Sequence, residues 1–251
     1  MLNLQTEFPT SRWQPGNRAA SSRSEPARWS SFDDVVELLR FDGALRRTDD
    51  TGLYSRRRYK AGAIALRMDQ PFDALHVVRF GSLKTSVTLV DGGEHVLNFP
   101  MKGDLLGLDG ICEQRYHSET VALTDCELIR LPATELFSAG HGGGDLERIT
   151  CWAISRNLVR DHVAYSLSHA ARSETRVARF LLAQSKRFAD MGYSPVCFTL
   201  PMTRRDIGNH LDVTLETVSR AFSALDHEGI ISVRLRTIEI LSMHRLRAFE
   251  R

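Results

Sequence analysis

The spacing of apolar residues changes twice along the chain, and these changes separate a strand-rich middle from a helical C-terminal part. Residues 1–30 show no apolar periodicity and are rich in Pro, Ser and Arg, so we predict a disordered tail there. Residues 31–47 carry apolar side chains at helical spacing behind a Ser31 or Asp33 cap, and they predict a short helix. Its apolar stripe consists of Val35, Leu38, Leu39 and Leu45.

Within residues 54–132 the apolar positions fall into short runs that predict β-strands. Residues 74–80, 83–90 and 95–99 are rich in β-branched and aromatic side chains, and glycine-containing turns separate them. Many short strands with little helix between them predict an antiparallel sandwich or barrel. We therefore place a first folded domain at residues 31–144.

After residue 144 the pattern becomes helical. Residues 145–171 contain neither Pro nor Gly and predict one long helix. The spacing of three and four residues along it resembles a coiled-coil seam, which predicts either a helix packed on its own domain or a helix that pairs with a second copy. The seam positions are 149, 152, 156, 159, 163, 166 and 170. Ser173 then predicts the cap of a further helix.

Two short helical segments joined by a tight turn follow in the C-terminal part. Thr203, with Asp206 three residues later, predicts a capped helix over residues 204–211. Thr214 predicts the cap of a second helix that ends just before Gly229. Two short helices joined in this way are typical of a helix-turn-helix.

The second of these helices has two chemically distinct faces. At about 100° per residue its apolar face consists of Val218, Ala221, Phe222 and Leu225. Glu216, Ser219 and Arg220 fall on the opposite face within the first two turns, the part of a recognition helix that reaches base edges. Arginine can bind guanine O6 and N7, and glutamate can accept from cytosine N4. Glu216 and Arg220 are also spaced as an ordinary surface ion pair, and their place in a helix-turn-helix is what favours base reading.

Residues 230–241 alternate between apolar and polar positions and predict a β-hairpin wing. Arg234 and Arg236 would lie near its tip, where they suit phosphate contacts. Four further polar residues are candidate DNA contacts, namely Thr203, Arg204, Thr214 and Thr217. We place the complete DNA-binding domain at residues 172–251.

Composition narrows the class of protein. The net charge of +2 neither requires nor excludes nucleic acid, because a basic face can be balanced elsewhere. No run approaches the roughly 20 apolar residues of a membrane span, and no apolar signal core follows Met1, so we expect a cytoplasmic protein with no membrane partner. Cys112, Cys126, Cys151 and Cys197 are too far apart for a CxxC pair and fit free thiols in a reducing compartment.

Three segments resemble the Fnr branch of the Crp/Fnr transcription regulators. They are residues 186–195, 200–211 and 214–220, and the last contains the Glu-Thr-Val-Ser-Arg core of that branch. The resemblance covers about residues 31–251. It implies an α+β protein with an N-terminal cyclic-nucleotide-binding-like β jelly roll, a long central dimerisation helix at residues 145–171 and a C-terminal winged helix-turn-helix.

The resemblance also implies a homodimer on double-stranded DNA with RNA polymerase as the regulated partner. The implied target is an Fnr-like palindrome of the TTGAT-N4-ATCAA type. Carried over by residue, Glu216, Ser219 and Arg220 are the base-reading trio.

The chain departs from the family pattern in three places. Fnr holds an iron–sulfur cluster on cysteines in its N-terminal segment, but this chain has no cysteine before Cys112. We therefore reject such a cluster and expect no cofactor, while haem or a small-molecule effector stays open. The cyclic AMP pocket needs an adjacent arginine and serine, whereas Arg115 and Ser118 are separated. Leu235 stands where relatives often carry the turn glycine of the wing.

Two other classes of function have clear requirements. A cyclic-nucleotide-binding module would need Arg115 and Ser118 to form a phosphate site. An enzyme would need a metal site in the strand domain, but His95 and His117 have only one adjacent glutamate each, and no catalytic constellation is present. We therefore expect no enzyme. The histidines in or near the first domain lack a haem motif; they are His76, His95, His117, His141, His162 and His169.

Overall fold

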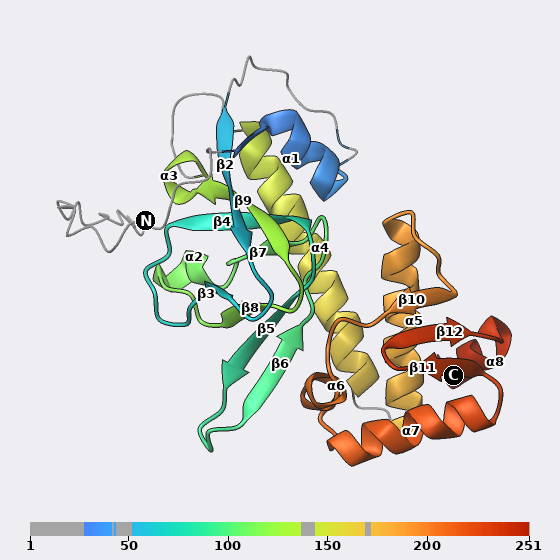
Figure 1. Cartoon of the computed structure of the whole chain (residues 1–251). Coiled ribbons are helices and arrows are strands. Elements are labelled where there is room, and N and C mark those ends of the chain that lie inside the picture. Colours follow the sequence, from blue (N-terminus) through green and yellow to red (C-terminus); the bar gives the residue numbers. More distant parts are fainter. Residues whose placement is uncertain (1–27, 42, 44–51, 137–143, 169–171, 251) are drawn as a thin grey trace, which may run out of the picture.

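The N-terminal domain is an antiparallel β-sandwich (Figure 1). The computed structural model describes residues 28–41, 43, 52–136, 144–168 and 172–250, without the side chains of residues 28, 161–168 and 250. One sheet contains, in spatial order, β1 (Arg28–Ser31), β2 (Leu53–Tyr59), β9 (Cys126–Pro132), β4 (Ala74–Phe80) and β7 (Leu105–Leu106). The other contains β3 (Ile64–Leu66), β8 (Glu119–Ala122), β5 (Leu83–Thr88) and β6 (Glu94–Asn98). The predicted sandwich is confirmed.

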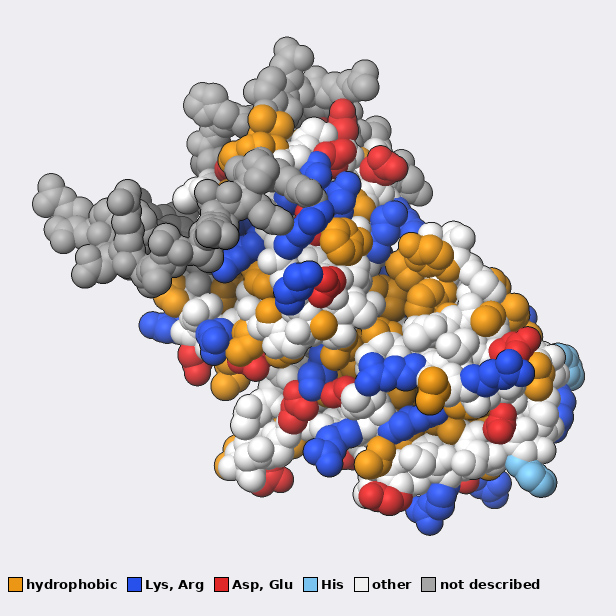
Figure 2. Space-filling view, viewed as in Figure 1, with side chains coloured by type: hydrophobic (Ala, Val, Ile, Leu, Met, Phe, Trp, Pro, Cys, Tyr) orange, Lys and Arg blue, Asp and Glu red, His pale blue; other side chains and the backbone are white. Residues whose placement is uncertain are grey.

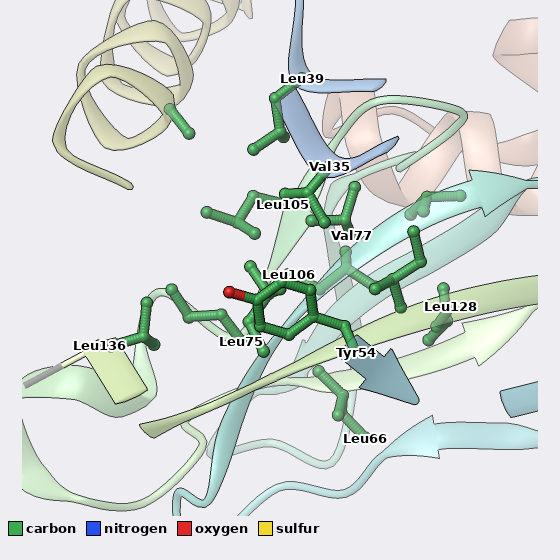
Figure 3. Packing of buried hydrophobic residues seen from close by; sticks show 14 of the residues in the cluster. Val35, Leu39, Tyr54, Leu66, Leu75, Val77, Leu105, Leu106, Leu128 and Leu136 are labelled. Atoms are coloured by element: carbon green, nitrogen blue, oxygen red, sulfur yellow. The ribbon is translucent and has the colours of Figure 1, made fainter. Parts of the chain in front are cut away.

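The core of the sandwich combines side chains of strands β2 and β4 with side chains from residues 32–39, the helix that precedes β2. Figure 3 shows Leu75, Val77 and Tyr54 pointing into one cluster with Val35 and Leu39. Tyr54 is 2% exposed, and the other four are 1% exposed or less. Burial of such large apolar groups stabilises each by roughly 1.5–3 kcal/mol relative to exposure. The single-turn helix α2 (Gly110–Glu113) connects β7 to β8, and a second one, α3 (Ala133–Leu136), follows the last strand of the sandwich, β9.

The N-terminal boundary differs from the prediction. Residues 28–30 belong to β1, which pairs with β2, so the predicted tail was wrong for its last three residues. The rest of that tail lies outside the described residues. This pairing depends on a strand about 25 residues away, which a local pattern does not reveal.

The first helix, α1 (Phe32–Leu39), is shorter than the predicted 31–47. Ser31 caps it as expected, because its hydroxyl accepts from the Asp34 amide while the Asp34 carboxylate accepts from the Ser31 amide. Arg40 ends the helix in a left-handed conformation with φ of 55°. Leu45, the last residue of the predicted stripe, lies outside the described residues.

Two long helices follow the sandwich: the first packs on it, and the second contributes Val177, Phe180 and Leu181 to the core of the C-terminal domain. The first, α4 (Gly144–Ser168), buries Ile149 and Ala153 against the sandwich. The second, α5 (Ser173–Asp190), begins with Arg172 at the N-cap position, so the predicted cap at Ser173 was wrong by one residue. No helix within the described ranges is both long and apolar enough to span a bilayer.

The C-terminal domain packs helices against a small sheet in the order β10-β12-β11. The elements are β10 (Cys197–Thr199), α6 (Arg204–Leu211), α7 (Leu215–His227), β11 (Ile231–Arg234), β12 (Thr237–Ile240), α8 (Met243–Arg247) and the 3₁₀ turn η1 (Ala248–Glu250). The two predicted helices and the predicted hairpin wing are confirmed.

The two domains are in direct contact. Val96 and Phe99, which belong to the sandwich, are buried in the same apolar cluster as the core of the C-terminal domain. His210 of α6 contacts the Val96 carbonyl oxygen through Nδ1 at 3.0 Å. Lys84 of β5 reaches the Asp206 carboxylate of α6 at 2.8 Å. The helix-turn-helix is therefore anchored to the β5–β6 hairpin.

Candidate nucleic-acid interface

Reciprocal capping starts the first helix of the motif. The Thr203 hydroxyl accepts from the Asp206 amide at 3.1 Å, and the Asp206 carboxylate accepts from the Thr203 amide at 2.8 Å. Burial raises the pKa of Asp206, but its bonds to Lys84 and Thr203 outweigh burial and hold that pKa below its ordinary value. The capping carboxylate is therefore ionised at neutral pH.

A close approach of the backbone sets the angle between the two helices. Asp212 ends α6 with φ of 53°, and Thr214 then caps α7 by accepting from the Thr217 amide at 3.2 Å. A Cβ on Gly208 would lie 2.6 Å from the carbonyl oxygen of Val213. Only glycine lets the turn pack this tightly on α6.

The second helix, α7, buries its apolar face and exposes the opposite one. Val218, Ala221, Phe222 and Leu225 are each 3% exposed or less. Glu216, Ser219 and Arg220 are all exposed, as expected for a face that meets a ligand from outside. Figure 1 shows α7 along the lower edge of the molecule, and Figure 2 shows Lys and Arg side chains along that same edge.

Glu216 and Arg220 of this exposed face, both in the described part of the chain, are not paired with each other. Arg220 donates to the Thr217 hydroxyl at 3.3 Å, and within the described residues it forms no ion pair with Glu216. The backbone amide of Glu216 and the Thr214 hydroxyl lower the pKa of Glu216. Glu216 is therefore a carboxylate acceptor, and Arg220 has donors left for an external partner.

Arg204 and Arg205 occupy different environments. The Arg204 guanidinium lies 3.4 Å from the centre of the Phe222 ring, half-buried, and its buried Nη1 has no hydrogen-bond partner. Arg205 is exposed, and its charge contributes to the lowered pKa of Glu216. Position 204 shares a helix face with Ile207 and Leu211, so helical spacing alone could have favoured Arg205 over Arg204 as a DNA contact.

The wing presents one free arginine and one engaged arginine. Leu235 forms the tip of the hairpin with φ of 57° and is 96% exposed. Arg236 donates to the Pro201 carbonyl oxygen at 2.9 Å, whereas Arg234 is exposed without an internal contact among the described residues. The left-handed conformation costs a leucine roughly 1–2 kcal/mol relative to the ordinary region. The wing therefore forms the same tight turn as one with glycine at its tip, at this cost in stability.

The candidate phosphate site of a cyclic nucleotide does not form. Arg115 is exposed and donates to the Asp69 carbonyl oxygen at 2.6 Å. Ser118 is buried and donates to the Asp109 carboxylate at 2.6 Å. The Asp109 carboxylate would repel a phosphate at this hydroxyl, so the two residues do not converge on one anion.

The thiols and the histidines that could bind a metal or haem are dispersed over the described residues. Cys112, Cys151 and Cys197 are exposed free thiols, and burial raises the pKa of the Cys126 thiol to about 11. His76 is buried with its pKa lowered to about 4 by desolvation, and His117 is exposed beside Glu113 at 3.3 Å. Within the described ranges, groups of three or more metal-ligating side chains are absent. The side chains of His141, His162 and His169 lie outside those ranges.

Comparison with known proteins agrees with this architecture. Residues 56–139 match the model of the cyclic nucleotide-binding domain, and residues 175–249 match that of the Crp-like helix-turn-helix domain. The chain is 39% identical to the transcriptional regulatory protein btr of Bordetella pertussis over 192 residues, which are 76% of this chain and 78% of that protein.

Two further similarities extend over most of the chain. The transcriptional activator protein anr of Pseudomonas aeruginosa is 31% identical over 185 residues, which are 74% of this chain and 76% of that protein. The solved structure of FixK2 from Bradyrhizobium japonicum superposes with a TM-score of 0.68 at 28% identity and covers 78% of this chain and 96% of that one.

Proposed function

Because the chain belongs to the Crp/Fnr family of DNA-binding transcription regulators, we propose that it binds an Fnr-like palindrome of the TTGAT-N4-ATCAA type as a homodimer and regulates transcription through RNA polymerase. The relatives are regulators and not enzymes, and this chain is not an enzyme either.

The exposed face of α7 carries this proposal. Glu216, Ser219 and Arg220 project from the first two turns of a helix whose opposite face is buried. The first turns of a recognition helix enter the major groove, where arginine pairs with guanine and glutamate with cytosine. The TTGAT half-site contains a single G·C pair, so we assign that pair to Arg220 and Glu216.

Flanking residues suit the phosphate backbone. Arg234 extends freely from the wing, and Thr214 and Thr217 lie at the start of α7, where backbone amides favour anions. Such contacts strengthen binding to every sequence and do not discriminate between bases.

An exposed apolar stripe on α4 supports the homodimer. Ile154 is 38% exposed and Leu158 is 53% exposed, and both follow the exposed Cys151 at spacings of three and four residues. This stripe faces away from Ile149 and Ala153, which pack on the sandwich. Apolar residues at that spacing form the seam of a coiled coil, so two copies would bury the stripe and place two α7 helices on the two half-sites.

Regulation through RNA polymerase is a separate step. A dimer on a palindrome upstream of a promoter should change the rate of transcript formation by purified polymerase in vitro. A scrambled palindrome at the same position is the control, and it should leave the rate unchanged.

Binding to DNA is the experiment that tests the proposal. The protein, purified in air, is titrated at fixed salt into a duplex carrying TTGAT-N4-ATCAA, a duplex with one half-site, and a scrambled duplex. We expect two chains per palindrome and at least about 10³-fold tighter binding than to the scrambled duplex. Equal affinity for palindrome and scrambled DNA, also after anaerobic purification, would overturn the proposed target.

A further inference from the structure

A basic hollow lies where the two domains meet. We call it the junction hollow; it is lined by the end of α1, the Met101–Asp104 turn, the middle of α4 and the end of α5. The turn contacts α1 closely, because a Cβ on Gly103 would lie 2.4 Å from the Leu38 carbonyl oxygen. Elements from both domains therefore form the walls of one small site.

The lining of the junction hollow carries a surplus of positive charge. Its five cations are Arg40, Lys102, Arg156, Arg160 and Arg187. Its two carboxylates are Asp104 and Asp190. Three positive charges therefore remain uncompensated at neutral pH.

The single buried carboxylate is already shared. Asp104 accepts from Arg160 at 2.6 Å and from Arg187, and its second oxygen also accepts from the Met101 amide at 3.0 Å. The single negative charge of Asp104 is therefore shared between two arginines and does not compensate the other cations. Arg40 and Lys102 are exposed at the rim, and within the described part of the chain neither side chain has a hydrogen bond or ion pair.

Among the described residues, Arg156 lacks both a carboxylate partner and an acceptor for one of its nitrogens. Its two terminal nitrogens donate to the Leu39 and Gly103 carbonyl oxygens at 2.8 and 2.6 Å, but its buried Nε has no partner. Burial lowers the pKa of Arg156 to about 10, and repulsion from Arg160 contributes. An anion in the hollow would offset the repulsion between Arg156 and Arg160 and would stabilise the charged form of Arg156.

We propose that the junction hollow binds a compact multivalent oxyanion, in the form of one phosphoryl group, between the sandwich and the DNA-binding domain. Arg40 and Lys102 supply free charged donors at the rim, and the arginines of α4 and α5 supply the field behind them. Because both domains contribute donors, the anion would stabilise the arrangement of the domains seen in Figure 1.

Calorimetric titration of the full chain tests this proposal. Inorganic phosphate and adenosine monophosphate are titrated separately, with ionic strength held constant by sodium chloride and with no DNA present. We expect saturable binding of one anion per chain. Tighter binding of the monophosphate would assign the site to phosphate esters, and equal binding would assign it to the free anion.

Variants at the rim localise the site without disturbing the half-buried arginines of α4 and α5. Arg40→Gln combined with Lys102→Gln should weaken phosphate binding about a hundredfold, since each of the two lost charged hydrogen bonds costs roughly a factor of ten. Arg67→Gln is the matched control, because Arg67 is an exposed cation away from the hollow, and it should leave binding unchanged. Absence of saturable binding, or equal weakening by the control, would overturn the proposal. The DNA target is not involved in either outcome.

Discussion

Helices α7 and α4 bury their inner faces in different ways. The inner face of α7 is apolar throughout, with Phe222 at its centre. The inner face of α4 is apolar only as far as Ala153, and beyond that Arg156 and Arg160 hold it to backbone carbonyls and to Asp104. A helix that packs on one apolar core has a continuous apolar face, whereas the buried face of a helix that contacts several elements combines apolar and charged side chains.

This difference bears on the seam predicted along α4, for which two alternatives were open: packing on its own domain or pairing with a second copy. At its first positions the helix packs on its own domain: Ile149 is buried against the sandwich, Trp152 packs beside it, and the Arg156 guanidinium lies 4.6 Å from the centre of the Trp152 ring. The apolar stripe that faces outward contains Ile154 and Leu158 instead. The last predicted seam positions, 163, 166 and 170, lie outside the described side chains.

The largest effect should come from the apolar face of α7. Phe222→Ala removes a ring that is 3% exposed and that supports Arg204, so unfolding free energy should fall by roughly 3–5 kcal/mol. Urea denaturation monitored by circular dichroism measures this loss. Ser223→Ala, on the exposed side of the same helix, should change stability by less than about 0.5 kcal/mol. A comparable loss in both variants would mean that the two faces are wrongly assigned.

The ionic face of α4 should be nearly as sensitive. Asp104→Asn leaves the half-buried Arg187 without its carboxylate and should cost about 3 kcal/mol of unfolding free energy, because Asp104 itself is buried. Burial raises the pKa of Asp104, but Arg187 and Arg160 outweigh it and hold that pKa below its ordinary value.

The pH dependence of this variant has a definite sign. Because the folded pKa of Asp104 is depressed, its contribution is complete above the unfolded pKa of about 3.9 and is lost as pH falls through the folded value. The stability difference between parent and Asp104→Asn should therefore stay constant from about pH 8 to 5 and shrink only below about pH 4. A difference that shrinks already between pH 8 and 6 would contradict this assignment.

Variants on the outer face of α4 distinguish the seam predicted from the sequence from the exposed apolar stripe of Ile154 and Leu158. Leu158→Glu puts unpaired carboxylates at the proposed two-fold contact and should raise the dimer dissociation constant at least about tenfold. Val159→Glu, at a position of the seam predicted from sequence and 59% exposed, should raise it much less. Sedimentation equilibrium measures both constants. A larger effect at Val159 would restore the original seam.

The smallest effect should come from the wing. Arg234→Ala should weaken binding to specific and scrambled DNA alike and lower the slope of log affinity against log salt by about one. Arg236→Ala should change the slope less, since Arg236 is engaged with Pro201. Titrations at four salt concentrations distinguish the two variants, and a loss restricted to the palindrome would show that Arg234 reads bases.

Local signals predicted the C-terminal domain closely. The Thr203–Asp206 capping box, the Thr214 cap and the glycine after α7 each lie within one element, so the sequence alone locates the ends of α6 and α7. The N-terminal boundary was less accessible, because β1 exists only through pairing with β2. The junction between domains was not predicted at all, since Lys84 and Asp206 are 122 residues apart.

The candidate site divides in the same way. Helical spacing placed Glu216, Ser219 and Arg220 on the exposed face of α7, and the structure places them there. The environment of Arg204 depends on its stacking against Phe222 of the neighbouring helix α7. Spacing within α6 predicts that Arg204 lies on the inner face but does not identify this partner. Contacts of Arg236 with Pro201 depend on the fold of the wing and could not be predicted from the sequence.

The central claim is that Arg220 reads the single G·C pair of each half-site. The most direct measurement is a double-mutant cycle at fixed salt that combines Arg220→Ala with replacement of this G·C pair by A·T in both half-sites. We expect each single change to cost about 1–3 kcal/mol per half-site and the double change to cost little more than either alone. Costs that add fully would mean that Arg220 does not contact this base pair, and the assignment of α7 as the recognition helix of the proposed palindrome would be wrong.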